Sequence, residues 1–82
     1  MIDVLYFAWV RERIGLPRER IDTAAPTVRA LIAELTAREE RYALAFADLT
    51  SLRVALDQTL SNFDAPLHGV REVAFFPPMT GG

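Results

Sequence analysis

The chain has 82 residues, a formal net charge of −2 and no cysteine, which suits one domain with a modest core. The lack of cysteine excludes disulfides, thiolate metal sites and cysteine nucleophiles. Without a basic block, nucleic acid is not expected as a partner. No leader pattern and no apolar run of about 18 residues is present, so we expect a cytoplasmic protein that contacts no membrane.

The first quarter of the chain predicts a hairpin that encloses a short helical turn. Over residues 1–8 apolar residues alternate, and Asp3 marks the odd-numbered positions as the solvent side. Residues 9–14 predict a helical turn that ends at Gly15 as its C-cap. Residues 17–23 predict an edge strand, because proline is tolerated at a strand start and charges blunt an exposed edge.

The best helix is predicted after Thr27, which is a good N-cap residue. The apolar residues Val28, Leu31, Ile32 and Leu35 follow at the spacing of one helix face. Residues 38–49 continue with helical composition. A break or bend is expected near Glu40, but the pattern does not locate it.

Three more strands complete the prediction. Alternation over residues 52–57 predicts one strand, and a very short one is expected around Leu60. Gly69 supplies a turn before the last strand, residues 72–76. One main helix on one face of a mixed sheet is an α+β arrangement, and parallel pairing of the first and last strands would make it a β-grasp.

The end of the chain predicts an extended tail, so we divide the chain into a domain over residues 1–76 and a tail over residues 77–82. The tail consists of Pro77, Pro78, Met79, Thr80, Gly81 and Gly82. Its prolines cannot continue a sheet ladder and favour an extended exit. Its six residues reach roughly 20 Å at about 3.3 Å each. Its glycines have no Cβ and can enter a slot too narrow for a side chain.

Two aromatic residues are expected on the outer face of the sheet beside this tail. Asp3 and Glu72 mark the outward positions of the first and last strands, and the same alternation turns Phe7 and Phe76 outward. Exposed aromatics on neighbouring strands form a patch of the kind that binds protein partners. Leu60 is a candidate member. Alternatively, another segment covers this face and both rings belong to the core.

The remaining polar residues indicate no catalytic apparatus. Arg11, Glu12 and Arg13 are either a solvated turn or a charged rim of the patch. His68 stands alone, and no metal signature, phosphate loop or nucleophile motif is present. All nine basic residues are arginine. One interpretation is codon usage. The other is functional: if the C-terminal carboxyl group were activated as an acyl group, the chain would have no lysine ε-amine to attack it.

Several motifs point to one family. They are V-L-Y-F-A at residues 4–8, V-R-E at 10–12, P-T-V at 26–28, Q-T-L at 58–60, F-D-x-P-L at 63–67 and E-V-A-F-F-P-P-x-T-G-G at 72–82. With them the chain resembles the small subunit of molybdopterin synthase, the sulfur carriers of molybdenum cofactor biosynthesis. The tail motif is the most specific, whereas residues 15–25 and 36–53 match only loosely.

The resemblance implies a ubiquitin-like β-grasp fold and a reaction cycle at Gly82. In this family a ubiquitin-activating-type enzyme adenylates the terminal glycine, and a sulfur donor protein converts the acyl-adenylate to a thiocarboxylate. Two carriers then supply the dithiolene sulfurs to precursor Z in the active site of the large subunit. The chain would not be an enzyme by itself and would hold no stable cofactor, only transient C-terminal AMP and thiocarboxylate sulfur.

The resemblance also implies roles for residues. Gly81 and Gly82 would be the reacting tail. The residues expected to contact partners are Phe7, Leu60, Phe76, Arg11, Pro77, Pro78, Met79 and Thr80. Alternatives remain: a sulfur carrier for thiamine or tRNA thiolation, a ubiquitin-like protein modifier, or an interaction module whose glycines are only a flexible end. Thiamine carriers are typically shorter and lack the F-F-P-P motif. The chemical modification that Gly82 undergoes would distinguish the remaining alternatives.

Overall fold

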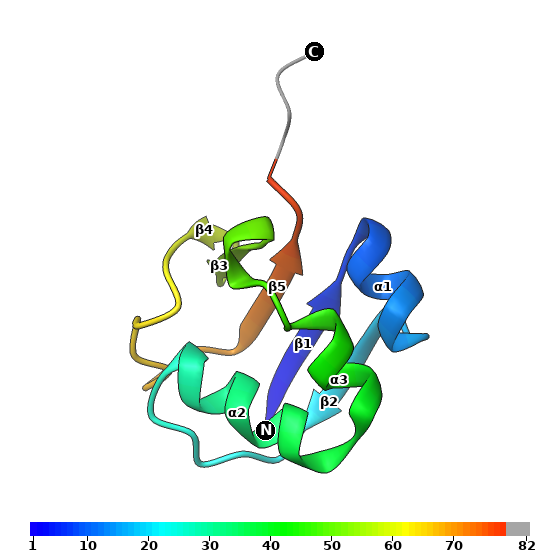
Figure 1. The fold of residues 1–82 in the computed structure, drawn as a ribbon. Coiled ribbons are helices and arrows are strands. Elements are labelled where there is room, and N and C mark those ends of the chain that lie inside the picture. The colour runs from blue at the N-terminus through cyan, green and yellow to red at the C-terminus, as the bar shows by residue number, and fades with distance from the viewer. Residues whose placement is uncertain (79–82) are drawn as a thin grey trace.

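The computed structural model describes residues 1–78 as a five-stranded mixed sheet with helices packed on one side (Figure 1). In chain order the elements are β1 (Ile2–Tyr6), α1 (Ala8–Ile14), β2 (Arg18–Ile21), α2 (Val28–Arg38), α3 (Glu40–Ala45), the 3-10 helix η1 (Leu49–Ser51), β3 (Arg53–Leu56), β4 (Thr59–Leu60) and β5 (Glu72–Phe76). Within residues 1–78 no helix is long and apolar enough to cross a bilayer.

The sheet has the β-grasp topology. Its strand order is β2-β1-β5-β3-β4. The first and last strands pair in parallel, with Val4 opposite Val73, while β2 and β3 flank them in antiparallel pairing. The predicted α+β fold is therefore confirmed, including the pairing on which the β-grasp depended. The charged strand β2 lies at one edge, as its composition predicted.

Alternation along the strands decides which side chains form the core. In β1, Ile2, Val4 and Tyr6 are buried, while the residues between them are only partly covered. In β5, Val73 and Phe75 are fully buried in the same way. Because adjacent strands share this phase, one face of the sheet is apolar and packs on the buried stripe of α2.

The helix ends follow from local chemistry. Thr27 caps α2, since its hydroxyl accepts a hydrogen bond from the Ala30 N–H at 3.1 Å. Gly15 ends α1 at φ 89°, a left-handed conformation that glycine adopts without strain. The expected break falls at Glu39, whose extended backbone separates α2 from α3. Helix α3 then ends at Ala45, and η1 follows where continued helix was expected.

A half-buried carboxylate joins the hairpin to the helices. Glu19 of β2 accepts hydrogen bonds from the hydroxyls of Tyr6 at 2.7 Å and Tyr42 at 2.5 Å. Arg41 of α3 donates to the carbonyl of Ile14 at 2.9 Å, which also fastens α1. Burial first, and then the bond to Glu19, raises the pKa of Tyr42 to about 12 and that of Tyr6 further still. Both tyrosines therefore stay protonated donors at neutral pH.

The turn between β3 and β4 places the start of β5. Asp57 and Gln58 have φ values of 50° and 70°, the conformation of a type I′ hairpin turn. The Asp57 carboxylate then accepts the backbone N–H groups of Arg71 and Glu72, each at 3.0 Å. This local use of an aspartate fixes the point at which β5 enters the sheet.

Candidate docking face and C-terminal exit

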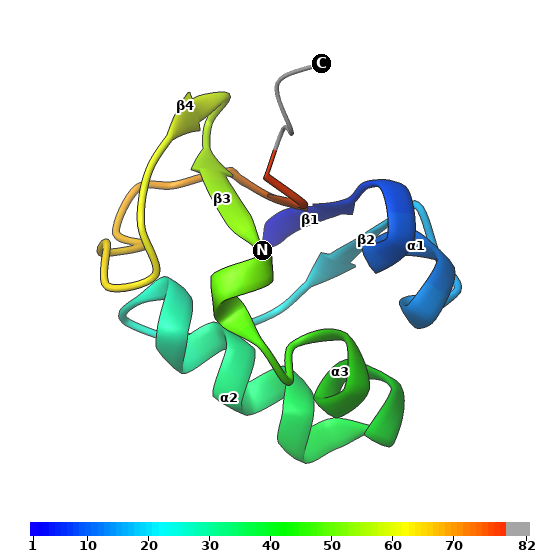
Figure 2. The same cartoon turned by 45° about the horizontal axis from the view of Figure 1, so that its top comes forward.

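The outer face of the sheet carries a row of apolar side chains across four strands. Strand register places Leu5 beside Ala74, Ala74 beside Ala55, and Ala55 beside Leu60. Residues paired across strands point to the same face. The helices α2 and α3 lie together on the opposite side of the strands (Figure 2). Within residues 1–78 no helix covers this row.

The side chains of Phe7 and Phe76 lie nearer the end of β5 than this row does. The backbone N–H of Phe7 donates to the carbonyl of Phe75 at 3.1 Å, so Phe7 continues the pairing of β1 with β5. Phe7 is 44% exposed and Leu60 is 67% exposed, whereas Phe76 is half-buried. The alternative in which both rings belong to the core therefore fails at Phe7, while Phe76 is partly covered. Their partner role stays a prediction.

Phe7 owes its position to a sharp turn. Ala8 adopts φ 54°, which costs a non-glycine residue about 1 kcal/mol. This conformation lets α1 begin directly after Phe7, which has extended backbone itself. The strand thus ends abruptly at an exposed aromatic ring, and α1 runs back along the helix side, where it packs against α3.

Two arginines lie near these rings. Arg53 lies opposite Phe76 in the sheet and donates to the carbonyls of Leu52 at 2.7 Å and Thr50 at 3.3 Å. Arg11 is exposed on α1. Neither forms an ion pair with a carboxylate among residues 1–78. This end of the face therefore suits a partner with acidic groups around an apolar centre.

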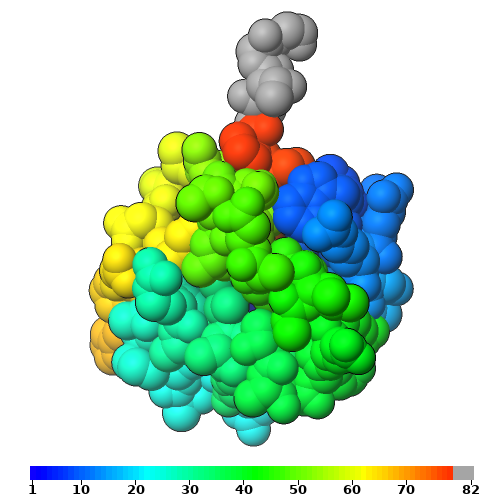
Figure 3. Space-filling model, viewed as in Figure 1, coloured from blue at the N-terminus to red at the C-terminus, as the bar shows by residue number. Residues whose placement is uncertain are grey.

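The chain leaves the sheet at this same end. Pro77 and Pro78 are half-buried and follow β5 without secondary structure, and the last described segment stands at the margin of the body (red in Figure 3). The expected roles of Met79, Thr80, Gly81 and Gly82 lie outside the described residues. The expected boundary between residues 76 and 77 falls at the end of β5, and the division into a domain and a tail stays a prediction.

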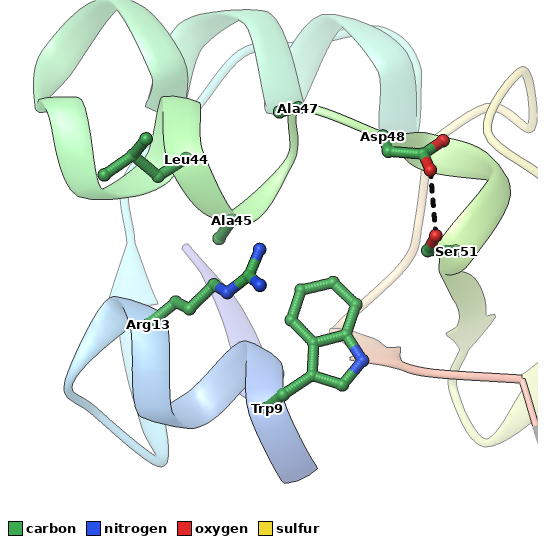
Figure 4. A pocket seen from close by; sticks show the side chains of 7 residues that line it. All are labelled: Trp9, Arg13, Leu44, Ala45, Ala47, Asp48 and Ser51. Atoms are coloured by element: carbon green, nitrogen blue, oxygen red, sulfur yellow. Dashed lines mark hydrogen bonds between the residues drawn. The ribbon is translucent and has the colours of Figure 1, made fainter.

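A recess on the helix side was not predicted. It has a volume of about 540 Å³ and lies between α1 and the segment from α3 to η1 (Figure 4). Its lining residues are Trp9, Arg13, Leu44, Ala45, Ala47, Asp48 and Ser51. Its one distinctive contact is the Arg13 guanidinium, 4.7 Å from the centre of the Trp9 ring. The sequence signal for it was Leu44, an apolar residue that ends up 60% exposed on α3.

The carboxylates outside the core are held by local hydrogen bonds. Asp48 accepts from the hydroxyls of Thr50 at 2.5 Å and Ser51 at 2.9 Å, and these bonds hold its pKa below the usual range. Arg29, 2.8 Å from Asp64, lowers the pKa of that carboxyl. His68 is exposed in the turn before β5. Within the described chain no group of three potential metal ligands comes together.

The fold is that of a ubiquitin-like β-grasp protein. Its two central strands are parallel, a helix packs across one face of the sheet, and the chain leaves at the end of the last strand. The chain belongs to the ThiS family, whose sequence profile matches residues 4–82. It is 49% identical over 82 residues to the molybdopterin synthase sulfur carrier subunit of Escherichia coli (strain K12), with the whole of both chains covered. To the protein of the same name from Haemophilus influenzae it is 37% identical over 82 residues, again covering both chains completely.

Comparison with solved structures supports the same fold. The crystal structure of SAMP1 from Haloferax volcanii superimposes with a TM-score of 0.76 at 21% identity, covering 99% of this chain and 98% of that one. At this identity the likeness concerns the fold alone.

Proposed function

We propose that the chain is the sulfur carrier subunit of molybdopterin synthase. The observation that carries this proposal is the 49% identity to a subunit of that name over the full length of both chains. The apolar face at the exit of the tail supports it, because a carrier must dock before its terminus can enter another protein's active site.

The proposed reaction takes place at Gly82. A terminal carboxylate has a pKa near 3.5, so at neutral pH it is ionised and a poor electrophile. Adenylation by a ubiquitin-activating-type enzyme makes its carbonyl carbon reactive, with release of pyrophosphate from ATP. Sulfur at the oxidation level of sulfide, supplied by a donor protein, then bonds to this carbon and displaces AMP, which leaves a thiocarboxylate. AMP and sulfur are thus transient groups on the chain, which needs no stably bound cofactor.

The described residues contribute docking and placement rather than chemistry. Phe7, Leu60 and Phe76 would contact the activating enzyme and the large synthase subunit in turn, with Arg11 at their rim. Since Phe76 is the last residue of β5, docking at this face sets where Pro77 and the rest of the tail begin. The large subunit would supply the catalytic side chains, and two carriers the two dithiolene sulfurs of molybdopterin.

The test is to incubate the chain with its activating enzyme, ATP and sulfur donor, and to measure its intact mass. We expect a gain equal to the exchange of one oxygen for one sulfur, followed by sulfur transfer to precursor Z when the large subunit is added. Failure to form either adenylate or thiocarboxylate would reject the proposal. A thiocarboxylate that the large subunit cannot use would instead indicate a carrier for thiamine or tRNA thiolation.

Removal of Gly82 provides the matched control. The shortened chain is expected to lose sulfur transfer completely, because its new terminal carboxyl group, on Gly81, ends one residue short of the position at which the partner enzymes act. Its thermal midpoint should stay unchanged, since the core lies entirely within residues 2–75. A parallel loss of folding would contradict a tail that acts only in transfer.

A further inference from the structure

The chain lacks the side chains that an activated acyl group attacks most readily. None of its 82 residues is lysine or cysteine, and all nine basic residues are arginine. Lysine amines and cysteine thiolates are good nucleophiles near neutral pH. The arginine guanidinium stays protonated and offers no free lone pair.

Packing explains only part of this arginine usage. Arg41 donates from one Nη to the carbonyl of Ile14 and from the other to the hydroxyl of Tyr42, and so uses the forked geometry that lysine lacks. Arg53 donates to the carbonyls of Thr50 and Leu52 from a single Nη. By contrast, the exposed side chains of Arg11, Arg38 and Arg71 form no hydrogen bond or ion pair within residues 1–78. At these positions lysine would keep the charge and add only a reactive amine.

Several hydroxyl groups are held by carboxylates. Tyr6 and Tyr42 are buried, and their hydroxyls donate to Glu19. The hydroxyls of Thr50 and Ser51 bond only to Asp48, whose lowered pKa makes it a weak base.

The histidine and the first residue lie at the far end of the sheet. His68 precedes β5, and Met1 precedes β1, which runs parallel to β5 with Asp3 opposite Glu72. The tail leaves past the opposite end, after Phe76, roughly 13 Å further along β5 at about 3.3 Å per residue. To meet either group, the tail would have to fold back along the whole strand.

We propose that this chain is protected against acylating itself within one molecule, so that the acyl acceptor must come from a partner. The proposal rests on the activation of Gly82 proposed above. In the excluded reaction, an amine nitrogen would attack the acyl carbon and form an amide bond. The bond from that carbon to AMP would break, AMP would leave with the electron pair, and the amine proton would pass to solvent.

The test activates the terminus without any partner enzyme. The full chain is prepared with Gly82 as a thioester, by thiolysis of an intein fusion, in the wild-type, Arg11→Lys and Arg71→Lys forms. Both substitutions keep the charge at an exposed position without contacts. Arg11 lies one helical turn after Phe7, near the exit of the tail, while Arg71 precedes β5 at the far end.

The wild-type thioester is expected only to hydrolyse. Arg11→Lys should form an internal amide, seen as a mass one water below that of the free acid, at a rate independent of protein concentration. It should do so at least about tenfold faster than Arg71→Lys, because a short tether gives an effective concentration in the millimolar range.

Two results would overturn the inference. One is a wild-type thioester that forms amide- or ester-linked species as fast as Arg11→Lys. The other is the absence of any amide from both lysine variants, since an added amine would then make no difference. Neither result bears on whether the activating enzyme adenylates the wild-type chain, so the proposed function stands or fails by its own measurement.

Discussion

The two faces of the sheet are built from the same strands but differ in how far they are buried. On the inner face Val4, Val73 and Phe75 are fully buried against the helices. On the outer face the intervening residues Leu5 and Ala74 form an apolar row that ends in an exposed Leu60. Whether an apolar side chain is buried in the core or lies on the outer face therefore depends on whether its position in the strand is odd or even. Substitutions at neighbouring residues can then separate effects on stability from effects on docking.

The largest effect is expected from the inner face. Phe75→Ala removes a ring that stacks near Tyr6, with centroids 6.2 Å apart, and meets Phe46 edge-on at 4.9 Å. We expect a loss of about 3–5 kcal/mol in the free energy of unfolding, because a cavity forms in a closed core. Urea denaturation measures it. A loss below about 1 kcal/mol would mean that the inner face is less tightly packed than its burial indicates.

The polar anchor of the inner face gives the next largest effect. Glu19→Ala leaves the hydroxyls of Tyr6 and Tyr42 without their common acceptor. Each unsatisfied buried hydroxyl costs about 1–3 kcal/mol, so we expect a loss of about 2–4 kcal/mol in the free energy of unfolding. Tyr42→Phe on the Glu19→Ala background is the control, since removing one orphaned hydroxyl should recover part of that loss.

The outer face predicts the reverse pattern. Phe76→Ala should lower the free energy of unfolding by less than about 1.5 kcal/mol, because the ring is only half-buried. Its affinity for the large synthase subunit should fall by about 2 kcal/mol or more, as for an aromatic residue at the centre of an interface. Calorimetric titration and denaturation of the same sample compare the two quantities.

Leu60→Ala serves as the companion variant for Phe76→Ala. Leu60 is far more exposed than Phe76, so its truncation should leave the free energy of unfolding within about 0.5 kcal/mol of wild type. If both variants lost stability and affinity in parallel, Phe76 would belong to the core and the distinction between the faces would be lost at this position.

Alkaline pH is expected to weaken the inner face alone. The pKa values of Tyr6 and Tyr42 are raised in the folded protein, that of Tyr42 to about 12 from 10.0. The stability they contribute is therefore complete below about pH 10 and is lost as pH rises through the folded values. The urea midpoint should stay constant from about pH 8 to about pH 10 and fall above it. An equally steep fall in a variant that carries both Tyr6→Phe and Tyr42→Phe would assign the effect to other groups.

Local patterns were sufficient for much of the fold. The structure confirms three predictions that depend only on neighbours in sequence. They are the alternation of buried and partly exposed residues in β1 and β5, the N-cap of α2 at Thr27, and the end of α1 at Gly15. The same parity also predicted the outward position of Phe7, which tertiary packing leaves exposed.

The features that local patterns did not locate or did not predict depend on contacts between distant segments. The break at Glu39 follows no composition change, but it lets α3 bring Tyr42 to Glu19 of β2. The recess beside Trp9 exists only because α1 and α3 pack side by side. The turn at Asp57 lacks the glycine that usually marks its type, and the carboxylate's role becomes visible only with the start of β5 in place.

The central position of β5 also has a mechanical consequence. From Glu72 to Phe76 the strand is hydrogen-bonded on both sides, to β1 in parallel and to β3 in antiparallel pairing. A pull on the chain beyond Phe76 runs along the strand, so both ladders carry the load together in shear instead of unzipping one bond at a time. A protein handed between enzymes by its end would gain from this arrangement, because tension on that end is spread across the middle of the sheet.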